Sequence, residues 1–108
     1  MNQKIEKYLP IGSVVLMKGA KKRVMIIGYA VQTSDTGDKI WDYTGCLWPE
    51  GMVSSDKNLL FDHENIGEIF ALGYTDETQK RFMGVLDKAT QLHNAKVEKI
   101  KVEEPEVL

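Results

Sequence analysis

Two short apolar runs around a glycine turn place the strongest constraint on the fold. Residues 13–17 are Ser-Val-Val-Leu-Met and residues 24–27 are Val-Met-Ile-Ile, with Gly19 in the polar segment that separates them. Short, β-branched runs on either side of a turn predict the two strands of a β-hairpin. Both runs are apolar on both faces, which is typical of central strands buried on two sides, as in a small closed barrel.

The rest of the chain up to residue 74 predicts further strands and turns. The second strand continues over residues 28–32, where Gly28 permits a bend or bulge. The other predicted segments are an exposed, mobile loop over 33–39, an aromatic strand over 40–48, a loop over 52–58 leading to the apolar run 59–61, a turn or single helical turn over 62–65 and a last strand over 66–74. We expect a mainly β (α+β) fold, either a small antiparallel SH3-like barrel or a strongly curved sheet of about five strands.

One amphipathic helix is predicted after the last strand. Asp76 is suited to cap its N-terminus, and Gln79 follows three residues later in the relation of a capping box. Apolar residues then recur at the spacing of a single helix stripe, and they are Phe82, Val85, Leu86, Ala89 and Leu92. Such a stripe needs an apolar surface, so we expect it to cover an open end or face of the sheet.

The length and composition of the chain fit one domain. Its 108 residues, 43% of them hydrophobic, can bury one core but are too few for two independent domains. We expect a flexible leader over residues 1–8, a β-rich domain with its helix over 9–94 and a charged flexible tail over 95–108. No window approaches the roughly 20 apolar residues of a membrane span. The single cysteine, Cys46, cannot form an internal disulfide, as expected of a cytoplasmic protein.

Charged residues are distributed unevenly along the chain. The balance of basic over acidic residues is +5 over residues 1–34, −8 over 35–77 and +1 over 78–108. Binding to phosphates needs a dominant basic face, and the only basic cluster here is one short turn, so the pattern argues against a nucleic-acid partner. The acidic middle fits a protein partner better.

No group of residues predicts catalysis or a cofactor. A thiol enzyme would use Cys46 with His63 as its base, and Asp42 or Asp62 would orient the histidine. No local signature surrounds these residues, so a core cysteine and a turn histidine are the simpler interpretation. The candidate metal ligands lack the paired spacing of a zinc site, and they are Asp62, His63, Glu64 and His93. We therefore expect no catalytic, metal or cofactor site.

Three aromatic residues offer a recognition surface instead. Trp41, Tyr43 and Trp48 belong to the class of side chains that concentrates binding energy at interfaces. The alternative is core packing, which is favoured for Trp41 and Tyr43 and is an equal alternative for Trp48. The candidate partner surface adds nearby carboxylates to these aromatic residues, and it consists of Trp41, Tyr43, Trp48, Glu50, Asp62 and Glu64.

Three blocks of sequence together resemble a known family. The blocks are residues 9–16 (Leu-Pro-Ile-Gly-Ser-Val-Val-Leu), residues 41–51 (Trp-Asp-Tyr-Thr-Gly-Cys-Leu-Trp-Pro-Glu-Gly) and residues 61–66 (Phe-Asp-His-Glu-Asn-Ile) leading to Gly73 and Tyr74. Their order and spacing are similar to those of the domain of unknown function 4176 family, over roughly residues 8–86. At Trp48 many members carry Tyr, a change that preserves an aromatic surface.

The resemblance implies a pathway rather than a mechanism. Members of the family occur in Gram-positive bacteria beside genes for type VII secretion and its polymorphic toxins, and the family has no established enzymatic activity. This neighbourhood implies a non-catalytic adaptor or chaperone-like module that binds a toxin or its helical targeting partner in the cytoplasm. The alternative is a cytoplasmic immunity protein that covers a toxin's active site with acidic residues such as Glu50, Asp56, Asp62 and Glu64.

Overall fold

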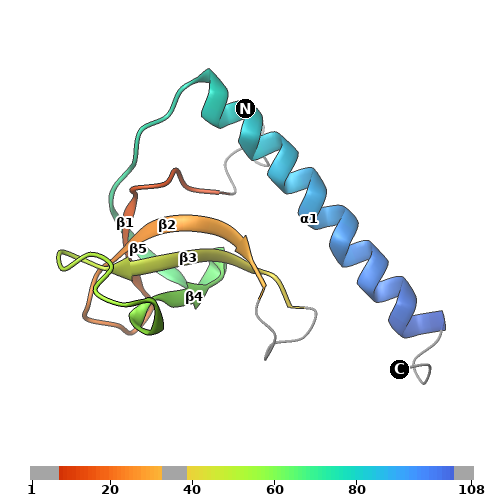
Figure 1. The fold of residues 1–108 in the computed structure, drawn as a ribbon, viewed down its shortest axis with the longest axis horizontal. Helices are drawn as coiled ribbons and strands as arrows, with labels where there is room; N and C mark the ends of the chain where they lie inside the picture. Colours follow the sequence, from red (N-terminus) through yellow and green to blue (C-terminus); the bar gives the residue numbers. More distant parts are fainter. Residues whose placement is uncertain (1–7, 33–38, 104–108) are drawn as a thin grey trace.

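The chain folds into one curved sheet with a long helix beside it (Figure 1). The computed structural model describes residues 8–32 and 39–103, with side chains as far as residue 93. The strands are β1 (Val14–Met17), β2 (Val24–Val31), β3 (Trp41–Leu47), β4 (Leu59–Phe61) and β5 (Ile66–Ala71), the short 3-10 helices Ser55–Lys57 and His63–Asn65 flank β4, and the α-helix is α1 (Glu77–Glu103). The predicted mainly β fold with one C-terminal helix is confirmed. Most of the predicted loop over 33–39 lies outside the described residues.

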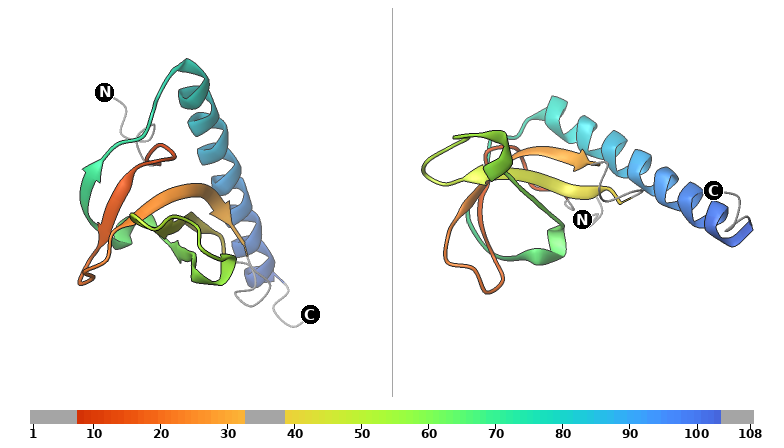
Figure 2. Two further views of the ribbon diagram at one scale, coloured as in Figure 1. Left: turned by 60° about the vertical axis from the view of Figure 1, so that its left-hand side comes forward. Right: turned by 60° about the horizontal axis from the view of Figure 1, so that its bottom comes forward.

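The sheet is antiparallel and open. Its strand order is β4-β3-β2-β1-β5, so β4 and β5 are its two edges. Of the two predicted architectures, the curved sheet is confirmed, whereas the closed barrel is not formed because the three-residue β4 offers little backbone for pairing with β5. The register of β2 against β3 shifts between Ile26 and Gly28, which is the bulge predicted at Gly28. Figure 2 shows the resulting curvature.

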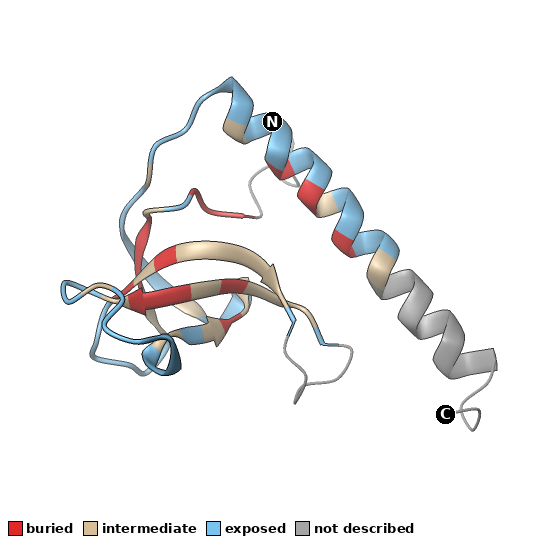
Figure 3. Cartoon of the chain, in the orientation of Figure 1, coloured by how far each residue is buried: buried red, intermediate tan, exposed pale blue. Residues whose placement is uncertain are grey.

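One core joins the sheet, the N-terminal segment and α1 (Figure 3). The ring of Tyr8 meets those of Tyr29 and Tyr43 edge-on, with centroids 5.5 and 6.0 Å apart, and its hydroxyl donates a hydrogen bond to Oγ1 of Thr90 at 3.3 Å. The predicted flexible leader is therefore wrong at Tyr8, because this aromatic side chain anchors the segment in the core. The core cluster consists of Tyr8, Leu9, Val15, Val24, Ile26, Tyr43, Phe61, Met83 and Leu86.

α1 begins where the sequence predicts and extends further. The backbone N–H of Gln79 donates a hydrogen bond to Oδ1 of Asp76 at 2.9 Å, which confirms the predicted N-cap. The helix continues to Glu103, so residues 95–103 are helical rather than a flexible tail, and residues 104–108 lie outside the described residues. Six of the nine residues of this extension are Lys, Glu or Ala, which have good helix propensity whether or not they bury a core.

The buried stripe of α1 differs from the predicted one. Over residues 77–93, where side chains are described, the buried ones are Met83, Leu86 and Thr90, and only Leu86 of these belongs to the predicted stripe. The hydroxyl of Thr90 accepts the hydrogen bond from Tyr8 and also reaches the carbonyl oxygen of Leu86 at 3.1 Å, so a polar residue is satisfied inside the core. The other members of the predicted stripe are exposed, and they are Phe82, Val85, Ala89 and Leu92.

Candidate functional site

Two neighbouring segments of the sheet edge exchange hydrogen bonds through their carboxylates. Antiparallel pairing of Tyr43 with Phe61 brings the residues beside them, Asp42 and Asp62, opposite one another. The backbone N–H of Asp42 donates to Oδ1 of Asp62 at 3.1 Å, and the backbone N–H of His63 donates to Oδ2 of Asp42 at 2.9 Å. We call the set Asp42, Tyr43, Asp62 and His63 the polar latch, because it ties β3 to the turn after β4.

The hydroxyl of Tyr43 extends the polar latch into the core. It accepts a hydrogen bond from the backbone N–H of Leu9 at 2.9 Å and lies 2.7 Å from Nδ1 of His63. Since a phenol has one proton to donate, a hydroxyl that accepts from Leu9 can donate to His63. Tyr43 is completely buried, and this burial raises the pKa of its hydroxyl well above the usual range. Tyr43 is therefore held neutral as a structural hydrogen-bonding group.

Asp62 also organises the charged groups around the polar latch. Its Oδ2 accepts a hydrogen bond from Nζ of Lys39 at 2.6 Å, and the same ammonium lies 4.6 Å from the ring centroid of Trp41. The backbone N–H of Asp62 donates to Oδ1 of Asn65 at 2.8 Å, which completes a capping box for the helical turn His63–Asn65. Both carboxylate oxygens of Asp62 are thus engaged within the fold.

The first and third sequence blocks also meet, at the end of β5. The backbone N–H of Gly73 donates to Oγ of Ser13 at 3.0 Å. A Cβ placed on Gly73 would lie 1.9 Å from the carbonyl oxygen of Ile11, so only glycine allows the two chain segments to approach this closely. Together with the polar latch, this contact shows that the three family-like blocks hold the fold together.

The catalytic grouping considered for Cys46 and His63 has the wrong geometry. Cys46 is 2% exposed and pairs with Met25 of the neighbouring strand β2, so its thiol is shielded from solvent. It lies three residues from Tyr43 on β3, and side chains at odd separations point to opposite faces of a sheet. His63 contacts Tyr43 on the other face. Among the described residues, no group of three or more His, Cys, Asp or Glu side chains is placed to hold a metal ion.

The candidate partner surface does not form one patch. Tyr43 belongs to the core, so its assignment to a surface is wrong: the antiparallel pairing of β3 turns its ring toward Tyr8 and Phe61. Trp41 is half-buried, and its indole Nε1 is a buried nitrogen that has no hydrogen-bond partner among the residues that the structure describes. Trp48 follows the other end of β3. It therefore lies about 20 Å from Trp41 along the strand, because β3 has seven residues and each advances the chain by about 3.3 Å.

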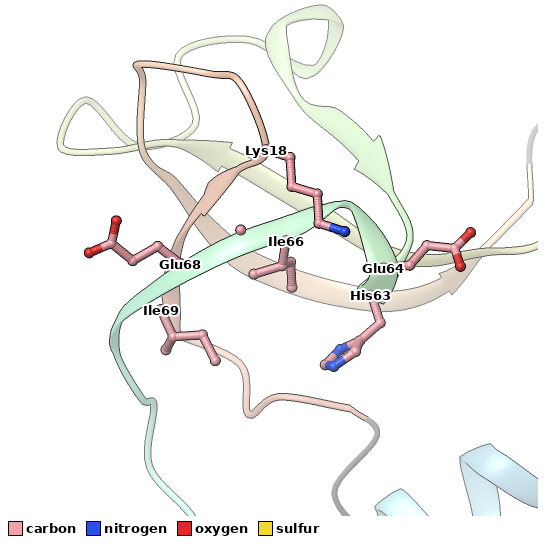
Figure 4. Close-up of a pocket in the computed structure, with 7 residues that line it drawn as sticks. Lys18, His63, Glu64, Ile66, Glu68 and Ile69 are labelled. Atoms are coloured by element: carbon pink, nitrogen blue, oxygen red, sulfur yellow. The ribbon is translucent and has the colours of Figure 1, made fainter.

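The carboxylates of that candidate surface are likewise separated and partly neutralised. Glu50 accepts a hydrogen bond from Nζ of Lys22 at 2.7 Å, which lowers the pKa of this exposed carboxyl. Asp62 is bound to Lys39, as described above. Glu64 is exposed beside an open hollow of about 410 Å³ under β5. In Figure 4 the side chains of Glu64 and Glu68 point away from each other, so the hollow does not gather charge around one point.

An exposed apolar surface is the feature that sequence reasoning missed. Of the twelve large apolar side chains that are exposed among the described residues, seven lie on β5, on the connector that follows it and on α1, and they are Ile69, Phe70, Leu72, Tyr74, Phe82, Val85 and Leu92. Residues 66–74 alternate like a half-buried strand, but β5 is an edge strand and only Ile66 among its residues is half-buried. The alternation predicts the strand correctly, but it does not indicate which segments of the chain cover its two faces.

Comparisons with known proteins identify a family. Within the described part of the chain, no helix has both the length and the apolar composition needed to cross a membrane. No curated protein matches the chain, and no solved structure matches it. A family model described as Domain of unknown function (DUF4176) matches residues 8–82, a range that contains all three sequence blocks, all five strands and the start of α1. The chain therefore belongs to the domain of unknown function 4176 family, as its sequence blocks predict.

Proposed function

We propose that this protein is a non-catalytic adaptor or chaperone-like module that binds another protein in the cytoplasm. The observation that carries this proposal is the run of exposed apolar side chains from β5 through the connector to α1. Exposed large apolar side chains in such number are typical of protein interaction sites, because leaving them in water is unfavourable unless a partner covers them. Tyr74 in the connector is 79% exposed, and Leu92 on α1 is 68% exposed.

The polar groups of the family-like blocks support the same proposal. The carboxylates and the histidine of the polar latch bond to backbone groups and to Tyr43, which is the pattern of groups that stabilise a fold. His63 does line the open hollow beside β5, but its Nδ1 is engaged with the hydroxyl of Tyr43, so this contact also serves the fold. The apolar surface, rather than the polar latch, is therefore the better candidate for the working part of the molecule.

The pathway in this proposal rests on the family. We infer that the module acts in type VII secretion of Gram-positive bacteria, and that its partner is a secreted toxin or a helical targeting protein. The chain's low net charge of −2 and its single short basic turn favour a protein over a nucleic acid as the partner.

A gene deletion in the native host tests the adaptor function. Without an adaptor, the neighbouring toxin should disappear from the culture medium while the cells stay viable, and the intact gene supplied in trans should restore export. Normal export from the deletion strain would contradict the proposal. Immunoblotting of medium and cell fractions measures the outcome, with an unrelated exported protein as the control.

The immunity alternative predicts a different result in the same host. Cytoplasmic expression of the toxin would then kill cells that lack this protein, and co-expression would rescue them. The described contacts give this alternative less support, because Glu50 is bound to Lys22 and Asp62 to Lys39, which leaves fewer free carboxylates to mimic a substrate. Rescue without any effect on export would favour immunity over the adaptor.

A further inference from the structure

α1 carries two apolar stripes, of which only one is used inside the fold. The buried stripe, Met83, Leu86 and Thr90, faces the core, and Figure 3 shows these positions along the side of α1 nearest the sheet. The second stripe, which we call the outer stripe, consists of Phe82, Val85, Ala89 and Leu92 and is exposed. Its intervals of three, four and three residues are those of the seam between two packed helices.

We propose that the outer stripe is a docking site for an amphipathic helix of a partner protein, whose apolar seam is flanked by Asp or Glu residues. This inference rests on the proposed adaptor function and specifies which surface and which partner chemistry it uses. The spacing of the outer stripe matches a facing helix, which presents knobs at the same intervals, better than an extended segment, which presents side chains at intervals of two.

Phe82 is prepared to act as an anchor at one end of the outer stripe. Its ring packs against Tyr29 with centroids 6.3 Å apart while half of its surface stays exposed. An aromatic side chain already held in place loses little conformational freedom on binding, which favours a contribution to affinity. The small side chain of Ala89, near the other end, leaves space for a large apolar residue of the partner helix.

Charge along the outer stripe favours an acidic partner over a second copy of this chain. Arg81 and Lys88 are exposed and lie seven residues apart on the flank that faces away from the buried stripe. In an antiparallel pair of α1 helices these flanks would face each other and bring like charges together. In a parallel pair, the flank with Arg81 and Lys88 on one helix would face the opposite flank of the second helix, which already packs against the sheet of its own molecule. Carboxylates on a different helix meet neither obstacle.

Two designed peptides test this site directly on the full chain. Both are about three heptads long with Leu and Ile in the seam, and one carries Glu and the other Lys at the flanking positions. Fluorescence anisotropy of the labelled peptides gives Kd at low and at moderate salt. We expect the Glu peptide to bind about tenfold more tightly than the Lys peptide, and expect salt to reduce this difference.

Matched variants locate the binding. Val85→Glu on the outer stripe should raise the Kd of the Glu peptide at least about tenfold. Val53→Glu is the control, because Val53 in the loop before β4 is 63% exposed and Val85 is 64% exposed, so both changes place the same carboxylate on the surface. The double variant Arg81→Glu with Lys88→Glu should reverse the preference from the Glu peptide to the Lys peptide. Circular dichroism checks that each variant remains folded.

Four outcomes would overturn the inference. They are failure of the Glu peptide to bind, equal binding of the two peptides, an equal effect of Val53→Glu and Val85→Glu, and a concentration-dependent dimer in sedimentation that Val85→Glu abolishes, which would make a second copy the occupant. These results leave the adaptor proposal standing if deletion of the gene still stops toxin export. Normal export together with peptide binding would overturn the adaptor function and keep the docking site.

Discussion

The two sides of the molecule use similar side chains in opposite ways. Around Tyr43, aromatic rings from the N-terminal segment, β2 and β3 pack together, and the hydroxyl of Tyr43 bonds to Leu9 and His63. Along β5 and the outer stripe of α1, aromatic and aliphatic side chains stay in solvent. The closed side contains most of the family-like blocks, although Tyr74 of the third block is exposed, and Val85, Ala89 and Leu92 lie beyond the residues that match the family.

This difference shows which part of the molecule the family resemblance describes. The matched residues account for the sheet, the polar latch and most of the core, whose members Met83 and Leu86 lie just beyond them. The surface that a partner would contact extends past them along α1, so members can share the closed side and differ in what they bind. Stability and binding should therefore respond to different substitutions, and the predictions below separate the two.

The largest loss of stability is expected at Gly73, where the closed side has no space for a Cβ atom. Gly73→Ala would place a methyl group 1.9 Å from the carbonyl oxygen of Ile11, and the two backbone segments must move apart. We expect the free energy of unfolding to fall by about 4 kcal/mol, measured by urea denaturation. Gly84→Ala is the control, because a Cβ there meets nothing within 4 Å and should stabilise α1 by about 0.5–1 kcal/mol. Similar effects at both glycines would refute the close-approach argument.

The next prediction compares the two stripes of α1. Met83 is 3% exposed, so Met83→Ala should lower the free energy of unfolding by about 3 kcal/mol through lost packing and a cavity. Val85→Ala, on the outer stripe, should change it by less than about 0.5 kcal/mol. Thermal and urea unfolding of the two variants measure the contrast. Equal losses would mean that the outer stripe is also packed within the fold.

A smaller effect is expected from the hydroxyl at the centre of the closed side. Tyr43→Phe keeps the ring but leaves the backbone N–H of Leu9 without its acceptor inside the protein. An unsatisfied buried donor costs about 1–3 kcal/mol, so the free energy of unfolding should fall by that amount. Tyr74→Phe is the control, because Tyr74 is 79% exposed and removal of its hydroxyl should have no effect. If the two variants match wild type, the hydroxyl of Tyr43 contributes nothing to stability.

The smallest effect is confined to alkaline solution. Burial raises the pKa of Tyr29 from 10.0 to about 12. Between these values the folded protein retains a proton that the unfolded chain has lost, so the free energy of unfolding should fall as pH rises from about 10 to about 12, with the contribution fully present below pH 10. Urea denaturation at several pH values should show a shallower decline for Tyr29→Phe. An identical decline in that variant would exclude Tyr29 as the source.

Much of the fold follows from local pattern. The hairpin, the bulge at Gly28, the helical turn after Asp62 and the N-cap at Asp76 were all predictable, because each depends on a few neighbouring residues. Tyr8 could not be assigned in this way, since it lies among polar residues and is held by rings from β2 and β3. Its burial is decided by contacts between segments that are distant in sequence.

The candidate site was harder to predict for the same reason. Both stripes of α1 have helical spacing, and hydrophobicity favours the one with Phe82, Val85 and Leu92 over the one with Thr90. Thr90 is buried because Tyr8 supplies a hydrogen bond to its hydroxyl, a partner that no helical pattern reveals. Tyr43 was open to a core or a surface role from sequence, and the pairing of β3 with β4 decides for the core.

The bond between Tyr8 and Thr90 joins residues 82 positions apart. Contacts of such separation form late, because the intervening chain must first be brought to order. During synthesis, Tyr8 therefore stays without this hydrogen-bond partner until Thr90 has been added to the chain. A chain that ends before Thr90 lacks the hydrogen bond that ties the N-terminal segment to α1, so the order of its first residues depends on some of its last ones.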